Sequence, residues 1–329
     1  MNIRSQAMLL LLPLLLGSDW SDSDTSLAMV VKDAISSNAS RWNSGALKVR
    51  LTFYSKPSAM NLEMDADVTW LGRQSLVAYR LRDITGNVIG SPSPDVPLNE
   101  QPINYIMRSP TSLYTYHSKN KSLVLYDPKR KEPIVEVFAV SPVDFWEYFH
   151  GGSLTAKRKW VDMIGPNPIF PDSTYSLARL DNHRVNFIRQ DSGGGMLELT
   201  SSMAVAGNVT KAAYKNRSGS PSFIQNYDWR TDRDGVAVLD KCEIRASRSG
   251  DLADADLSLV AEFKDIDLKT KVLPAKFTED SLFRLLPPGF TFVNQVTGKR
   301  VRNGGLRTET DSRLKSVAKD LKRHGFLAR

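Results

Sequence analysis

The chain has 329 residues, of which 41% are hydrophobic and 24% charged, as is ordinary for a globular protein. This composition excludes wholesale disorder, a collagen-like repeat and a polytopic membrane protein. Lys and Arg outnumber Asp and Glu by 44 to 36, and the resulting charge of +8 favours anionic surfaces but is too small to indicate nucleic-acid binding.

Residues 1–19 have the pattern of a secretory signal peptide. Arg4 supplies a positive charge, residues 7–16 form an apolar run, and Gly17 and Ser18 follow as small residues. The run is too short to cross a bilayer as a helix, although a buried N-terminal helix is an alternative interpretation. We therefore expect an exported protein, periplasmic or extracellular, that is soluble after signal cleavage.

The next segment changes from a helical period to a strand period. Apolar residues between Leu27 and Ile35 recur at helical spacing and predict an N-terminal helix. Two runs, 47–54 and 60–70, then alternate apolar and polar residues, which places one apolar face on each strand. The apolar positions are Leu47, Val49, Leu51, Phe53, Met60, Leu62, Met64, Val68 and Trp70.

Further strands and two helices are predicted in the middle of the chain. Strand patterns cover 76–82, 103–108, 112–117 and 122–126, and later 184–189, 196–203, 223–229, 236–246 and 257–263. Between these groups, Ser141 and Pro142 begin a helix that carries Phe145, Trp146 and Phe149, and 153–164 predicts a second helix. The fold class is therefore α+β: a strongly curved antiparallel sheet, a half or incomplete β-barrel, whose concave face is covered by the N-terminal helix and the two mid-chain helices.

The C-terminal tail, 306–329, is basic and predicts an amphipathic helix over about 312–324. Its basic positions are Arg313, Lys315, Lys319, Lys322 and Arg323. One interpretation is a surface helix that docks loosely on the sheet, and the other is reversible peripheral contact with an anionic membrane surface.

Motifs for catalysis or metal binding are absent from the sequence. The histidines lack metal-ligand spacing, and neither G-x-S-x-G nor a phosphate loop occurs, so we expect no metal and no cofactor. The single cysteine, Cys242, excludes an internal disulfide and falls in a strand pattern, where a buried inert thiol is expected. Glu63, Asp65 and Asp67 share one strand face, which is typical of a solvated surface. A hydrolase that uses them remains an alternative if they line a concavity.

Several short motifs resemble the periplasmic outer-membrane lipoprotein carrier superfamily (LolA/LolB-like). They are a strand that ends in Tyr-Asp-Pro at 126–128, Phe-Lys-Asp-Ile-Asp at 263–267, Leu-Pro at 273–274 and Leu-Pro-Pro-Gly-Phe-Thr-Phe-Val at 286–293. The resemblance implies one half-barrel domain over residues 20–305, whose apolar cavity shelters acyl chains.

Two functions from different classes follow from this sequence. The first is a non-enzymatic protein that binds an acyl chain, lipid or lipoprotein, with the nine apolar strand residues and the aromatic residues of the mid-chain helix as its lining. The alternative is a structural or regulatory module of the cell envelope, with the same fold, a filled core and a protein partner. Export argues against a nucleic-acid partner.

Overall fold

The computed structural model describes residues 24–85, 95–126, 148–150, 157–164, 174–250, 252–295, 297 and 299–302. The signal segment 1–19, Phe145, Trp146 and the tail residues Arg313, Lys315, Lys319, Lys322 and Arg323 lie outside the described residues, so their roles stay predictions. Within the described ranges, none of the helices has the length and apolar character to cross a membrane.

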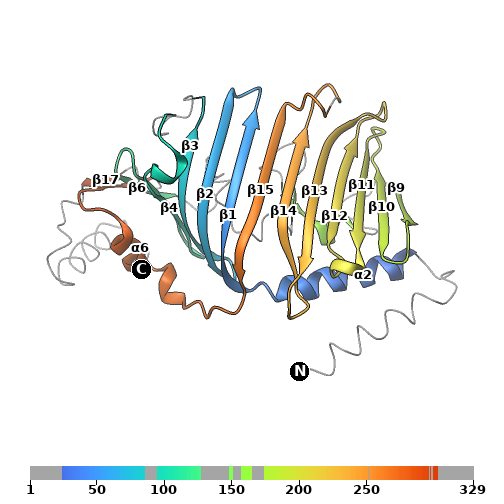
Figure 1. The fold of residues 1–329 in the computed structure, drawn as a ribbon, viewed down its shortest axis with the longest axis horizontal. Coiled ribbons are helices and arrows are strands. Elements are labelled where there is room, and N and C mark those ends of the chain that lie inside the picture. Colours follow the sequence, from blue (N-terminus) through green and yellow to red (C-terminus); the bar gives the residue numbers. More distant parts are fainter. Residues whose placement is uncertain are drawn as a thin grey trace.

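Strands dominate the described structure (Figure 1). The helices are α2 (Asp24–Ser40), α5 (Trp160–Met163) and α6 (Glu279–Leu285), with 3-10 turns η1 (Leu98–Glu100), η2 (Met203–Val205) and η3 (Pro274–Phe277). The strands are β1 (Ser44–Ser55), β2 (Met60–Leu71), β3 (Gln74–Asp83), β4 (Asn104–Arg108), β5 (Leu113–His117), β6 (Ser122–Tyr126), β7 (Tyr148–His150), β8 (Lys157–Lys159), β9 (Thr174–Arg179), β10 (Arg184–Gln190), β11 (Met196–Ser202), β12 (Val209–Lys215), β13 (Pro221–Thr231), β14 (Ala237–Ala246), β15 (Leu257–Asp267), β16 (Thr291–Asn294) and β17 (Lys299–Arg302).

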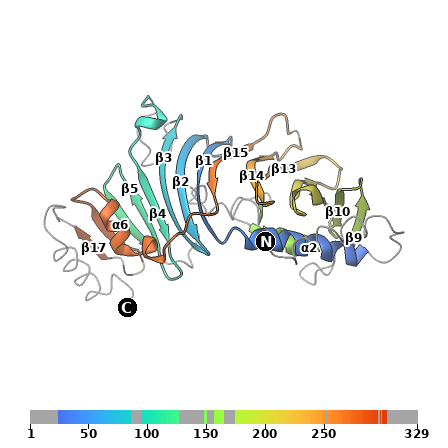
Figure 2. The ribbon, with the colours of Figure 1, turned by 60° about the horizontal axis from the view of Figure 1, so that its bottom comes forward.

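Two meanders meet in the middle of one large, unclosed sheet. Its order is β17-β16-β6-β5-β4-β3-β2-β1-β15-β14-β13-β12-β11-β10-β9, and β7 and β8 form a separate pair. The chain therefore builds outward from β1 to β6, starts again at the far edge with β9 and returns to the centre, where β15 pairs with β1. The pairs are antiparallel, as predicted, apart from the parallel pair β6–β16. Figure 2 shows the curvature of this sheet.

Two apolar cores lie on opposite faces of the sheet. Consecutive residues of a strand point to opposite faces, and on β4 Ile106 belongs to the first core whereas Met107 belongs to the second. The first core contains buried residues of β1–β3 and β10–β15, together with residues of α2 and α5. In the second, Leu282 and Phe283 of α6 pack against the tyrosines of β5. The helices α2 and α6 therefore stabilise different faces.

The N-terminal helix is confirmed as α2, and it runs beneath the strands β14 to β10 (Figures 1 and 2). Its buried side chains, Ala28, Val31 and Ile35, join the first core. At its end the Asn38 amide donates to the carbonyl of Ala237 and accepts from the Ala237 amide, both at 3.0 Å. The Asn38 side chain thus bonds both the amide and the carbonyl of the first residue of β14, and these two hydrogen bonds hold α2 on the sheet.

The second mid-chain helix is confirmed over Trp160–Met163 and is wrong over residues 157–159. Where a helix was expected over 153–164, residues 157–159 form β8 and α5 spans only Trp160–Met163. The expected helix that begins at Ser141 is wrong at Phe149, because the backbone of this residue lies in β7; residues 141–147 and the side chain of Phe149 lie outside the described part of the chain. The run Lys157-Arg158-Lys159 pairs with the preceding strand β7, and this strand pairing overrides the preference of the segment for helix.

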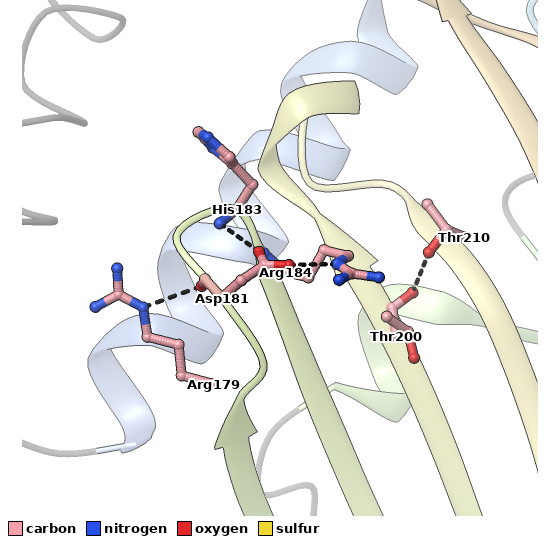
Figure 3. A network of polar contacts seen from close by, with 6 residues as sticks. All are labelled: Arg179, Asp181, His183, Arg184, Thr200 and Thr210. Atoms are coloured by element: carbon pink, nitrogen blue, oxygen red, sulfur yellow. Dashed lines mark hydrogen bonds and ion pairs between the residues drawn. The ribbon is translucent and has the colours of Figure 1, made fainter.

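The hairpin between β9 and β10 is built around Asp181 (Figure 3). Its carboxylate accepts hydrogen bonds from the backbone amides of His183 and Arg184, each at 2.8 Å, and from the Arg184 guanidinium at 2.6 Å. The amide of His183, followed by the guanidinium of Arg184, holds the pKa of the Asp181 carboxyl at about 2, below its usual value. This network makes the turn sensitive to acid.

We expect Asp181→Asn to lower the melting temperature near pH 6 and to have a much smaller effect near pH 2. A carboxyl with a depressed pKa stabilises the folded state above its unfolded pKa of about 3.8, and this stabilisation is lost as the pH falls towards 2. Melting curves from pH 2 to 7 measure the difference. Asn182→Ala in the same turn, which removes a group that does not titrate, is the control. An effect of Asp181→Asn that is constant across this pH range would contradict the prediction.

Candidate functional site: the apolar face of the sheet

The structure gathers the predicted apolar strand residues on one face of β1 and β2. Eight of them are buried, and Met60 is partly buried against the same core. Neighbouring strands extend this surface, and we call it the apolar face. Besides the residues of β1 and β2, it includes Val77, Tyr79 and Leu81 on β3, Leu259, Ala261 and Phe263 on β15, Cys242 and Ile244 on β14, Gln225 and Tyr227 on β13, and Val185, Phe187 and Arg189 on β10.

Alternation in the sequence explains why these side chains share a face. In β1 every second residue from Leu47 to Phe53 is buried and the residues between them are exposed. The register then places Leu51 opposite Met64 on β2 and opposite Ala261 on β15. Because the period of a strand is two, one correct register brings every apolar position to the same side.

The helices α2 and α5 pack in the same core as the apolar face. From α5 and the residue after it, Trp160, Met163 and Ile164 are buried in this core. The Trp160 ring lies edge-on to the Tyr227 ring of β13, with 5.9 Å between centroids. The carbonyl of Met163 accepts a hydrogen bond from the Arg189 guanidinium at 3.4 Å. A single helical turn therefore connects β13 to β10, which lie three strands apart in the sheet order.

A small polar cluster is buried within the apolar face. The Gln225 amide donates to the hydroxyl of Tyr227 and to Cys242 Sγ. Burial raises the pKa of the Cys242 thiol to about 12 and that of the Tyr227 hydroxyl well above its usual value. Both groups are therefore neutral at pH 7, and the expectation of a buried thiol at Cys242 is confirmed.

Sequence reasoning missed Gln225 and Arg189, the polar members of this face. Both occupy inward positions of an alternating strand, Gln225 between Phe223 and Tyr227 and Arg189 two residues after Phe187. The available signal was a polar residue at a position where the alternation predicts an apolar one. Such an exception points to a specific local role, because burying a polar or charged group costs free energy unless it is compensated.

Glu63, Asp65 and Asp67 lie on the opposite face, where Asp65 and Asp67 line a groove of about 350 Å³. Arg50 lies 3.8 Å from Asp65, and Arg82 lies 3.4 Å from Glu63. The acidic column of β2 thus runs between basic residues of β1 and β3. The concavity that the hydrolase alternative requires is therefore present at Asp65 and Asp67. Opposite charges in register stabilise neighbouring strands, and the ion pairs of Asp65 and Glu63 have the arrangement of a cross-strand charge ladder. Across the described residues, no cluster of three or more His, Cys, Asp or Glu side chains is placed to hold a metal.

No protein-family model matches the sequence, and no curated protein matches it. Solved structures resemble it over most of the chain. A LolA superfamily protein from Nitrosomonas europaea is 14% identical and has a TM-score of 0.37, with 77% of this chain and 98% of that chain covered. An outer-membrane lipoprotein-sorting protein domain from Vibrio parahaemolyticus is 9% identical, with a TM-score of 0.41 and coverage of 78% and 99%.

A DUF1329 family protein from Desulfovibrio piger is 8% identical, with a TM-score of 0.38 and coverage of 79% of this chain and 100% of that chain. The chain is similar to solved structures of the superfamily that its short motifs resemble. Since every one of these TM-scores lies below 0.5, the likeness says nothing about what this chain binds.

Proposed function

We propose that the protein is an exported, non-enzymatic binding protein that holds the acyl chain of a lipid or lipoprotein against the apolar face. The observation that supports this proposal is the asymmetry of the first core. One side is an extended apolar sheet surface, whereas the other side, in the described part of the chain, contains α2 and the single turn of α5. The turn of α5 is four residues long, so a ligand that displaces it takes the place of three buried side chains, Trp160, Met163 and Ile164.

Met64 supports the same proposal. This unbranched side chain is fully buried in the middle of β2, within the apolar face. Methionine has a flexible, polarizable side chain that adapts to irregular apolar partners. An acyl chain that lies along β2 would therefore meet a side chain able to repack around it.

The second candidate function is an envelope module with a filled core and a protein partner. The observation that favours it is the burial of the face, since Met64 and Trp70 are both 0% exposed. In a single conformation, a filled core and a closed binding site bury their apolar side chains to the same extent. They differ in whether an apolar molecule can enter.

Uptake of the neutral dye N-phenyl-1-naphthylamine distinguishes these functions. The dye fluoresces in an apolar environment, so a binding site gives a saturable increase in fluorescence that dodecanoate reverses. A filled core gives no saturable signal. The absence of dye uptake, together with cross-linking in cells that recovers a protein and no lipid, would overturn lipid binding and support the second function.

A matched pair of substitutions tests whether the uptake occurs at the apolar face. Ala66 lies on this face of β2, and Ala78 of β3 lines the groove on the opposite face. We expect Ala66→Leu to reduce dye uptake several-fold with a small change in melting temperature, because the added methyl groups occupy space that the ligand uses. Ala78→Leu is the control and should leave uptake unchanged. In a filled core Ala66→Leu would instead destabilise the protein by about 1–3 kcal/mol through overpacking.

A further inference from the structure

The groove of about 350 Å³ opposite the apolar face is a feature that the proposed function does not use. Ala78 of β3, the register partner of Asp67 on β2, lines it together with Arg80, which follows two residues along β3. Ile103, just before β4, adds an apolar wall. A short side chain thus lies between two charged ones, in a space large enough for a small molecule.

Most of the charged side chains around the groove already have a partner of opposite charge. Three of its four cations form ion pairs: Lys48 with Asp265 at 2.7 Å, Lys264 with Glu262 at 3.2 Å, and Arg50 with Asp65 at 3.8 Å. Two lining charges are left over, the guanidinium of Arg80 and the carboxylate of Asp67.

Arg80 is held at one nitrogen and open at the others. Its Nε donates to the carbonyl of Gln101 at 3.1 Å, and to the described residues its two terminal amino groups make neither a hydrogen bond nor an ion pair. The exposed carboxylate of Asp67 likewise has no hydrogen bond or ion pair within the described ranges. The groove therefore presents one anchored cation and one carboxylate, each able to take a ligand group of opposite charge.

We propose that this groove binds a small zwitterion in which a phosphate and an ammonium group are joined by a short carbon spacer, as in phosphoethanolamine. The terminal amino groups of Arg80 donate to two phosphate oxygens, for which the planar guanidinium is suited. The ammonium group donates to Asp67, and the spacer lies over Ala78 beside Ile103. This inference does not rest on acyl-chain binding, because the site lies on the other face of the sheet.

Spacing and charge select this class of ligand. Arg80 and Asp67 occupy diagonal positions of the antiparallel pair β2–β3, about 7–8 Å apart, so an α-amino acid, with both charges on one carbon, is too short to meet both. Cations of the lining outnumber its carboxylates by four to two, which favours a ligand with net negative charge. A phosphate monoester carries a charge of about −1.5 to −2 at pH 7, more than a carboxylate.

Isothermal titration calorimetry of the full chain at low ionic strength tests the proposal with three probes. O-phosphoethanolamine carries both charges, ethyl phosphate lacks the ammonium group, and ethanolamine lacks the phosphate. We expect the zwitterion to have a Kd about three- to fivefold lower than that of ethyl phosphate, the size expected for one ion pair at a surface, and ethanolamine to bind more weakly still. Equal affinity for O-phosphoethanolamine and ethyl phosphate, or no binding of either, would overturn the proposal.

The phosphate and ammonium groups can belong to a free solute or to a lipid head group. Sedimentation with vesicles of phosphatidylethanolamine and phosphatidylcholine, compared with phosphatidylcholine alone, separates these sources. Association that needs phosphatidylethanolamine and is reversed by O-phosphoethanolamine assigns the site to a head group. Binding of O-phosphoethanolamine without such association assigns it to a free solute.

Substitutions then locate the two contacts. We expect Asp67→Asn to remove the advantage of O-phosphoethanolamine over ethyl phosphate, and Arg80→Gln to weaken both phosphates several-fold. Ala78→Leu, which fills the groove, should weaken both as well. Lys211→Gln on β12 and Asp228→Asn on β13 remove exposed charges outside the groove and are the controls. An advantage of the zwitterion that survives in Asp67→Asn, an exposed position where folding is not at risk, would overturn the proposal.

Discussion

Replacing Trp70 by alanine is expected to lower the free energy of unfolding by about 3–5 kcal/mol, as large-to-small changes of buried aromatic residues do. The Trp70 ring is 0% exposed and stacks on Trp42 with 6.2 Å between ring centroids. Its indole N–H donates to the carbonyl of Trp42 at 2.7 Å. The substitution therefore leaves both a cavity and a buried acceptor that has lost its donor.

Gly45 leaves room for the Trp70 ring, because it has no side chain. A Cβ atom at this position would lie 2.6 Å from the Trp70 ring and equally close to the backbone oxygen of Asp267. The smallest residue in β1 thus faces the largest in β2, and the two are register partners. Chemical denaturation of Trp70→Ala, with Thr69→Ala on the other face as the control, measures the effect. A loss below about 1 kcal/mol would contradict the importance of this packing.

Asn38→Ala is expected to destabilise the protein by about 2–4 kcal/mol, because it removes the partners of two buried backbone groups at once. The Asn38 side chain is 3% exposed and satisfies both the amide and the carbonyl of Ala237. In the variant, the Ala237 carbonyl still accepts a hydrogen bond from the indole of Trp42 at 3.1 Å. The buried Ala237 amide loses the Asn38 oxygen that accepts its hydrogen bond.

Urea unfolding of Asn38→Ala measures this loss, with Ser37→Ala as a control at an exposed position of the same helix. We also expect increased hydrogen exchange at the start of β14 in the variant, because α2 no longer holds Ala237. Stability equal to that of Ser37→Ala would mean that α2 is held on the sheet by its apolar contacts alone.

Elements with a strong sequence period were predictable. The alternation in 47–54 and 60–70 predicted β1 and β2 and the side of each strand that is buried, because one face of this sheet faces a core. The spacing of the apolar residues from Leu27 to Ile35 predicted α2, because apolar residues that recur with a period of 3.6 lie on one side of a helix.

Elements whose structure depends on distant partners were not predictable. The run Val-Thr-Lys-Ala-Ala-Tyr-Lys of β12 mixes Val, Thr and Tyr, which favour strands, with Lys and Ala, which do not, and it becomes a strand because β11 and β13 pair with it on both sides. The helix α6 had a local signal, the side chain of Thr278 that caps it, but its seven residues are too few to show a period. The meeting of β15 with β1 joins residues more than 200 positions apart, and no local pattern encodes it.

The candidate site also contains residues that were predictable from the sequence and residues that were not. The apolar lining on β1 and β2 was predicted residue by residue, since it follows from alternation alone. Arg189 and Gln225 were missed, because their role depends on strands β10 and β13 and on α5, which come together only in the folded sheet. The carboxylates of β2 illustrate the reverse case, a conspicuous cluster that the register explains as cross-strand pairs.

Native mass spectrometry of the full chain, purified without detergent and incubated with dodecanoate, tests the central claim most directly. If the apolar face accepts an acyl chain, the folded protein acquires the mass of one ligand in a saturable manner, and Ala66→Leu reduces the occupancy whereas Ala78→Leu does not. The bare polypeptide mass at every ligand concentration would contradict this account and leave a filled core with a structural role.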